Sequence, residues 1–463
     1  MRSTAGSATC SSRSSTRRGC EGVRAGEDGH WVDPQPLRPV ADRLRSGSLD
    51  LHAYVDQLCD RIERVETDVH AYVDEPGRRE RLHAEAARLA QHWPELEGRP
   101  PLFGIPVAVK DIVRVDGLPT RAGSRLPPEV LAGPQAGMVS RLRDAGALVA
   151  GKSATAEFAN FAPGETRNPH DLTRTPGGSS SGSAAAVAAA TALLATGTQT
   201  VGSVVRPAAF CGVVGWKSTH GRVPKDGVVD HSPSFDSVGM FAADVDGVTT
   251  AAKVLCPNWA EPPAVDRLVV GLPVGNYLDQ ADVEALIVFT RQLELLRGAG
   301  HEVTDVPFAD LLGSYPELLA HNLTINRYEL AATHQAWFDV HRDLYRPQTV
   351  GAIEHGRSIS DAAYAEARAH LDDVRAAVDE RLSAAGVDLL VAPAALGAAP
   401  VGIDTTGDPA MALPWTYAGL PAVSLPGAST ALALPLGLQL VGRAGSDEAL
   451  LAAAATLEPV VGS

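Results

Sequence analysis

The sequence contains no apolar run long enough to cross a bilayer. Its longest candidate, residues 184–195, is about a dozen residues and is interrupted by Thr191, whereas a spanning helix needs about 20. The run is typical of a buried helix. We therefore expect a soluble protein with no membrane partner.

Positive charge is in deficit. The chain has 40 Lys and Arg against 55 Asp and Glu, which gives a formal net charge of −15. A surface of this sign repels phosphate backbones and anionic lipids, so nucleic acid is not expected as a partner.

Cysteine is scarce, and its positions form no metal-binding or disulfide pattern. The five cysteines are an odd number without a C-x-x-C spacing, at positions 10, 20, 59, 211 and 256. Reduced thiols in a cytoplasmic protein are the expectation. Arg17-Arg18 resembles part of a twin-arginine export signal, but no apolar segment follows it. We interpret residues 1–35, rich in Ser and Gly at their start, as a disordered extension.

The composition of the chain is that of a soluble globular protein. It is 45% hydrophobic and only 5% aromatic, with 44 Gly and 33 Pro in 463 residues, which indicates a core of small aliphatic side chains. Strand-like and helix-like patterns alternate, so we expect an α/β fold in a single domain over 36–463. Helices are expected at 51–65, 78–92, 139–145, 184–196 and after Ser446 as a capping residue, and strands at 103–109, 147–150, 389–392, 422–426 and 437–441.

One motif is misleading. Residues 146–153, G-A-L-V-A-G-K-S, match the phosphate-binding Walker A pattern. That motif needs a strand, then a flexible loop, then a helix. Here the supposed loop is the apolar run 147–150, which has the pattern of a buried strand, and the preceding residues are helix-like. A nucleotide site is therefore not expected.

A second motif leaves more than one interpretation open. Residues 178–182, G-S-S-S-G, fit the G-x-S-x-G nucleophile elbow, although no strand pattern precedes them. They also fit a Gly/Ser linker, except that they run directly into an apolar helix. Ser179 would lie near the N-terminus of that helix, where free N–H groups favour negative charge.

Two further segments carry possible chemistry. Thr200-Val-Gly-Ser203 places a serine after a glycine, a pattern in which successive backbone N–H groups can point into one concavity and form an oxyanion hole. Lys110 ends an apolar strand. Its ordinary interpretation is an ion pair with Asp111, and the alternative is a desolvated, neutral lysine that acts as a base on a serine.

Together these segments resemble the amidase signature family. The resemblance rests on five motifs and covers about residues 45–255 and 385–460; the motifs lie at 104–111, 146–158, 175–187, 207–215 and 437–443. It implies a central, mixed, twisted β-sheet covered by helices on both faces. It further implies a signature core over about 100–255, a variable helical region over about 257–385, and a C-terminal core segment over about 386–460.

The resemblance implies a Ser-cisSer-Lys triad. By motif position, Ser203 is the nucleophile, Ser179 the bridging serine and Lys110 the base. The backbone N–H groups of the segment from Thr200 through Val201 and Gly202 to Ser203 form the oxyanion hole, supported by Gly178 and Ser180. No metal or organic cofactor is implied.

The chain departs from the family pattern around the nucleophile. Gln199 stands where Asp is common, Val201 where Gly is common, and Arg206 lies one position later than usual. Ser181 likewise replaces a glycine. A β-branched residue does not readily adopt positive φ, so Val201 raises the question of whether the backbone there can form the same site.

Three functions remain open. The first is a free-standing amidase that hydrolyses a small carboxamide to an acid and ammonia or an amine, with a homodimer left open. The second is the glutaminase subunit of a tRNA-dependent amidotransferase, and the third is an inactive relative. We expect the substrate pocket to be walled by residues 300–385 and 408–417, with Phe158 as a further candidate. Trp415 and Tyr417 fit a core role equally well.

Overall fold

The computed structural model describes residues 31–309 and 315–462. The extension expected over residues 1–35 falls largely outside this range. Its last residues are described and bonded to the core: the Trp31 backbone N–H donates to the Pro169 carbonyl at 2.9 Å, and its indole Nε1 donates to Asp68 at 3.0 Å. The expectation of disorder is therefore wrong from Trp31 onward.

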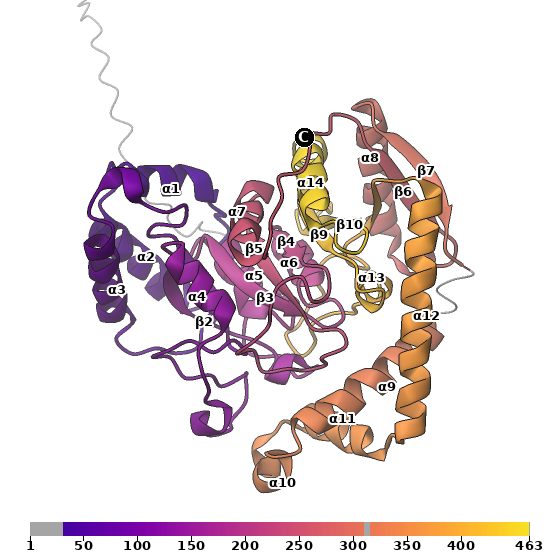
Figure 1. The fold of residues 1–463 in the computed structure, drawn as a ribbon, viewed down its shortest axis with the longest axis horizontal. Helices are drawn as coiled ribbons and strands as arrows, with labels where there is room; N and C mark the ends of the chain where they lie inside the picture. The colour runs from indigo at the N-terminus through magenta and orange to yellow at the C-terminus, as the bar shows by residue number, and fades with distance from the viewer. Residues whose placement is uncertain (1–30, 310–314, 463) are drawn as a thin grey trace, which may run out of the picture.

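The described residues form a ten-stranded mixed sheet in the order β2-β1-β3-β5-β4-β9-β10-β8-β6-β7 (Figure 1). Both ends of the sheet are parallel, and the strands between them pair antiparallel. The strands are β1 Pro106–Lys110, β2 Leu148–Ser153, β3 Leu194–Gln199, β4 Val214–Lys217, β5 Ser237–Ala242, β6 Val269–Val274, β7 Glu302–Pro307, β8 Leu389–Pro393, β9 Ala422–Ser429 and β10 Pro435–Val441.

Helices cover both faces of this sheet, as expected. Consecutive residues of a strand point to opposite faces. In β5, the ring of Phe241 faces the side of Ser180 and Val204, whereas the methyl group of Ala242 faces Gly247. The helices are α1 Leu37–Arg45, α2 Leu51–Val65, α3 Arg78–His92, α4 Gly137–Asp144, α5 Ser181–Ala188, α6 Val205–Cys211, α7 Val245–Leu255, α8 Val283–Gly298, α9 Tyr315–Thr333, α10 Phe338–His341, α11 Pro347–Ser358, α12 Asp361–Ala385, α13 Leu413–Tyr417 and α14 Asp447–Val461.

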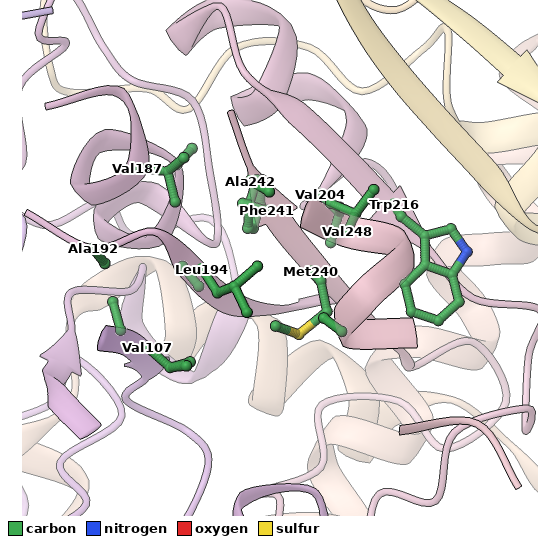
Figure 2. Packing of buried hydrophobic residues seen from close by; sticks show 14 of the residues in the cluster. Val107, Val187, Ala192, Leu194, Val204, Trp216, Met240, Phe241, Ala242 and Val248 are labelled. Atoms are coloured by element: carbon green, nitrogen blue, oxygen red, sulfur yellow. The ribbon is translucent and has the colours of Figure 1, made fainter. Parts of the chain in front are cut away.

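The core lies between the sheet and these helices. Figure 2 shows its centre, where Val187 of α5, Leu194 of β3, Met240 of β5 and Val248 of α7 pack around the strands, and Trp216 of β4 closes one side. All are buried. Small aliphatic side chains dominate this core, in agreement with the composition.

The variable region forms an arm beside this core. Helices α9, α10, α11 and α12 lie together at one side of the molecule (Figure 1), and α9 packs against both α11 and α12. The region also contributes β6 and β7 to the edge of the sheet, two strands that the sequence analysis did not anticipate. None of the described helices is both long and apolar enough to span a bilayer.

The alanine-rich segment differs from expectation. The helix ends at Ala188 rather than continuing to residue 196, because Ala190 adopts a left-handed conformation with φ of 53°. Leu194–Gln199 is strand β3, paired to β1 on one side and β5 on the other. Periodicity cannot distinguish a short buried strand from the end of a buried helix.

Other elements agree closely with the sequence. Helices α2 and α3 have the expected bounds of 51–65 and 78–92, and β8, β9 and β10 lie where C-terminal strands were expected. The cap of α14 is an exception: the Ser446 hydroxyl makes no capping hydrogen bond and donates to the Arg443 carbonyl instead.

The first prediction concerns Gly182 in α5, which lies against other backbone. A Cβ there would meet the Ala71 carbonyl oxygen and come within 2.5 Å of the Ala154 nitrogen. We expect Gly182→Ala to lower the free energy of unfolding by about 3 kcal/mol, because overpacking forces the backbone to shift. Denaturant titration measures this.

The matched control is Gly351→Ala in the exposed face of α11, where a Cβ meets nothing within 4 Å. Alanine has the higher helix propensity, so this variant should gain up to about 1 kcal/mol. Equal effects of the two substitutions would contradict the close approach at Gly182.

Candidate functional site

The carboxyl end of β1 places a lysine at the site. β1 and β3 are parallel neighbours, so both strands deliver their last residues to the same edge of the sheet. Lys110 ends β1, and its Nζ donates to Ser179 Oγ at 2.9 Å and to Thr198 Oγ1 at 2.8 Å. The side chain is fully buried, and among the described residues no carboxylate forms an ion pair with it.

Burial lowers the pKa of Lys110 to about 7, and the charge of Asp236 acts in the opposite direction. Desolvation penalises the charged ammonium because the interior replaces water poorly. Near neutral pH a large fraction of Lys110 is therefore the free amine, which can accept a proton from Ser179.

Asp111 is not the partner of Lys110. Its carboxylate pairs instead with Lys152 Nζ at 2.9 Å, and Lys152 also donates to Thr120 Oγ1 at 3.0 Å. Lys152 is the lysine of the Walker-like motif. It lies in strand β2, buried in this ion pair, so residues 146–153 form no phosphate-binding loop.

The Gly/Ser segment leads into α5, and of its three consecutive serines only Ser179 lines the pocket of the site. The Gly178–Ser179 peptide bond is cis, as the family resemblance implied. Ser180 points inward, where its hydroxyl donates to the Thr198 carbonyl at 3.3 Å, and Ser181 donates to the Gly177 carbonyl at 2.7 Å. The interpretation of Ser180 as an elbow nucleophile is therefore wrong.

Arg206 supports the same segment from α6. Its guanidinium is buried and donates to the Gly178 carbonyl at 2.7 Å and to Thr406 Oγ1 at 3.1 Å. A Cβ on Gly178 would come within 2.6 Å of Thr406 Cγ2. The arginine thus holds the peptide group that precedes Ser179, although it lies one position later than the family pattern.

Gln199 organises the turn between β3 and α6, on which Ser203 lies. Its Oε1 accepts from the backbone N–H groups of Val204 at 2.8 Å and Val205 at 3.0 Å. Its Nε2 donates to Thr416 Oγ1 at 2.8 Å, and that hydroxyl donates to the Val201 carbonyl at 2.7 Å. The amide binds donors and acceptors at once, which a carboxylate in the same place could not do.

Val201 fits the turn without strain. Its φ is not positive, and its side chain packs in the apolar cluster around Trp415. Within the described chain, the backbone N–H groups of residues 200–203 donate to no protein acceptor. They remain available to a ligand in the pocket that they line together with Ser179.

That pocket is small, with about 340 Å³ of space between its walls. Asn326 of α9 and Pro409 lie in the two expected walls, 300–385 and 408–417, whereas Thr406 lies just before the second. The other lining residues are Ala159, Asn160, Phe161, Ser179, Thr200, Val201, Gly202, Ser203, Arg206 and His231.

Phe158 and Trp415 do not line this pocket. The Phe158 ring packs on His334 and Tyr345, at centroid distances of 4.4 and 5.3 Å. The indole of Trp415 donates to the Tyr277 hydroxyl at 3.0 Å in the core. Tyr417 is likewise fully buried.

Three polar residues of the pocket lining, Asn160, His231 and Asn326, were not expected from the sequence. His231 lies between Phe158 and α9: its Nδ1 is 2.9 Å from the Phe158 carbonyl oxygen and its Nε2 is 2.7 Å from Asn326 Oδ1. No motif distinguishes these residues, because they come from a loop and a helix about 95 positions apart. Within the described residues, no three His, Cys, Asp or Glu side chains are grouped to bind a metal ion.

Comparison with known proteins gives consistent matches. A family model described as amidase matches residues 53–451. The A subunit of the glutamyl-tRNA(Gln) amidotransferase from Geobacter metallireducens is 32% identical over 409 residues, which cover 77% of this chain and 84% of that protein.

Solved structures show the same likeness. One crystal structure of an amidase superposes with a TM-score of 0.83 at 31% identity, covering 92% of this chain and 100% of its own. The native peptide amidase of Stenotrophomonas maltophilia superposes with a TM-score of 0.79 at 27% identity, covering 94% and 97%.

The second prediction concerns the contacts of Gln199. Gln199→Met keeps a similar volume but removes the acceptor of two buried N–H groups, so we expect a loss of about 3 kcal/mol in the free energy of unfolding. Chemical denaturation measures the loss. Gln335→Met, at an exposed position, is the control and should change stability by less than about 0.5 kcal/mol.

Proposed function

The chain belongs to the amidase family, and within that family we propose that it is a free-standing amidase that hydrolyses a small carboxamide through an acyl-enzyme on Ser203. The observation that carries this proposal is the bond between the buried Lys110 and Ser179, at 2.9 Å, beside the pocket that Ser203 lines. A neutral lysine joined to a serine is a base for nucleophilic catalysis.

In the proposed reaction, protons move along Ser203, Ser179 and Lys110. Ser203 Oγ attacks the amide carbonyl carbon while its proton passes to Ser179 Oγ, whose own proton passes to the Lys110 amine. The carbonyl oxygen becomes an oxyanion, and the N–H groups of residues 200–203 stabilise it. The C–N bond then breaks, the proton returns through Ser179 to the leaving nitrogen, and ammonia or an amine departs. Water repeats the sequence on the acyl-enzyme and releases the acid.

The small pocket favours a small substrate. The lining is also polar, with Asn160, His231 and Asn326 among its residues. Phe161 is the most exposed large apolar residue of the lining, at 46%. A short carboxamide with a polar acyl group fits these walls.

A second candidate function is the glutaminase component of a tRNA-dependent amidotransferase. The 32% identity to the Geobacter metallireducens protein favours it. Against it, the bonds among Lys110, Ser179 and Thr198 form within this chain alone, and the sequence 198–207, T-Q-T-V-G-S-V-V-R-P, departs from the pattern common in that component.

The third prediction tests the nucleophile and its base. We expect a fluorophosphonate to form one covalent adduct, on Ser203, detected by intact mass and peptide mapping. Lys110→Ala should slow labelling by at least about 100-fold, because the base is lost, whereas Lys225→Ala, at a partly exposed ion pair, should label as the wild type does. An adduct on another serine would contradict the proposal.

The fourth prediction concerns pH. The base acts only when Lys110 is neutral, so protonation below its pKa removes activity. The rate of Ser203 labelling should therefore rise as the pH increases through about 7 and then level off. A rate that is independent of pH between about 5 and 9 would contradict the assignment of Lys110 as base.

The fifth prediction separates the two candidate functions. Purified chain alone should release ammonia from short carboxamides, measured across an amide series that includes glutamine. Addition of the other amidotransferase components and tRNA should not change that rate by more than about twofold, because Lys110, Ser179 and Ser203 all belong to this chain. Activity that appears only with those partners would favour the glutaminase component.

A further inference from the structure

A buried carboxylate lies behind the turn of residues 200–203. Asp236 immediately precedes β5, and only 7% of its surface is exposed. Its Oδ2 accepts from the backbone N–H groups of His231 at 2.8 Å and Ser232 at 2.9 Å. These bonds close residues 231–236 into a loop around the carboxylate. The other carboxylate oxygen, Oδ1, takes no part in them and can accept a hydrogen bond from outside the loop.

Oδ1 binds the turn that we assign as the oxyanion hole. Thr200 Oγ1 donates to Asp236 Oδ1 at 2.5 Å, a short bond of the kind that charged acceptors form. Thr200 is the first of the four consecutive residues, 200–203, that line the pocket and whose N–H groups donate to no acceptor within the described chain. Because its side chain is fixed at this point, the direction of its peptide group is fixed as well.

The same carboxylate acts on the base. The charge of Asp236 favours the protonated form of Lys110 and so opposes the effect of burial on the pKa. Lys110 bonds to Thr198, two residues before Thr200. Asp236 thus lies beside the carboxyl end of β3, because Gln199 of β3 pairs with Ser237 of β5.

No cation neutralises this carboxylate. Across residues 31–309 and 315–462, no Lys, Arg or His side chain forms an ion pair with Asp236. The charged groups around the loop form hydrogen bonds and ion pairs with groups other than the Asp236 carboxylate. Arg375 donates to the Ser234 carbonyl. Glu329 of α9 accepts from the Ser232 hydroxyl and lies 3.6 Å from Arg368. The ring nitrogens of His231 face Phe158 and Asn326. Lys152 and Asp111, on the strands beside Lys110, pair with each other.

We propose that Asp236 is a positioning residue: its hydrogen bond to the Thr200 hydroxyl orients Thr200 in the oxyanion hole. The inference rests on the proposed amidase function. It assigns a role to a residue outside the pocket lining. Orientation needs the Thr200 hydroxyl, whereas the effect of the charge on Lys110 needs only the carboxylate, so different variants test the two.

The test measures the second-order rate of Ser203 labelling by a fluorophosphonate, and kcat/KM for an amide substrate, as functions of pH. Thr200→Val removes the hydroxyl but keeps the charge, so we expect the plateau rate to fall about 10- to 100-fold while the acidic limb keeps its position. Thr200→Ser keeps the hydroxyl, so its plateau rate should lie within about threefold of the wild-type rate.

Asp236→Asn removes the charge. Without it Lys110 holds its proton less tightly, so the acidic limb should move to lower pH, and the plateau should fall as well. Asp236→Ser repeats the measurement if the Asn variant does not fold. Ser232→Ala, which removes a loop hydroxyl from Glu329 and keeps Asp236, is the control and should leave the acidic limb in place.

The outcomes are distinguishable. If the wild type is not labelled at Ser203, the proposed function fails. If the wild type is labelled and Thr200→Val matches it, the positioning effect is overturned. If both neutral variants at position 236 retain the wild-type acidic limb, or if Ser232→Ala moves it equally, the effect of the charge is overturned.

Discussion

The burial of Lys110 without an ion-paired carboxylate is the constraint on which the site depends. An unpaired ammonium in the interior is costly, and the chain tolerates it because hydroxyl and carbonyl oxygens of Ser179 and Thr198 surround the nitrogen. Burial then shifts the lysine toward its neutral form. A carboxylate in direct contact would stabilise the fold and remove the base. Asp111, the carboxylate next to Lys110 in the sequence, forms its ion pair with Lys152 instead.

The sheet brings these groups together from distant parts of the chain. β1 carries the lysine, β3 leads into the serine turn, and β5 follows the buried Asp236. The three strands are neighbours in the order β1-β3-β5, so one edge of the sheet carries Lys110, the serine turn and Asp236. The helical arm completes the enclosure: Glu329 and Asn326 of α9 contact the 231–236 loop. The helical arm thus supports a loop that lies beside the central sheet.

Departures from the family pattern are accommodated by compensating contacts. Gln199 takes the place of a common Asp and uses both ends of its amide, to the helix N-terminus and to Thr416. Val201 replaces a glycine, but its φ is not positive, so no glycine is required there. Arg206, displaced by one position, still reaches the Gly178 carbonyl from the first turn of α6. None of these contacts follows from the motif alone.

The sequence by itself determined the family, the α/β class, helices such as α2 and α3, and the residues Lys110, Ser179 and Ser203 as candidates, because motifs and periodicity are local properties. Tertiary structure decided what local patterns leave open. Residues 194–199 form a strand that pairs with both β1 and β5, although periodicity alone did not distinguish the start of this strand from the end of the preceding helix. Tertiary structure also pairs Asp111 with Lys152 and places Phe158 outside the pocket. It brings Asn160, His231 and Asn326 into the pocket lining and Asp236 against Thr200. Those contacts join residues far apart in the chain, and long-range packing alone brings them together.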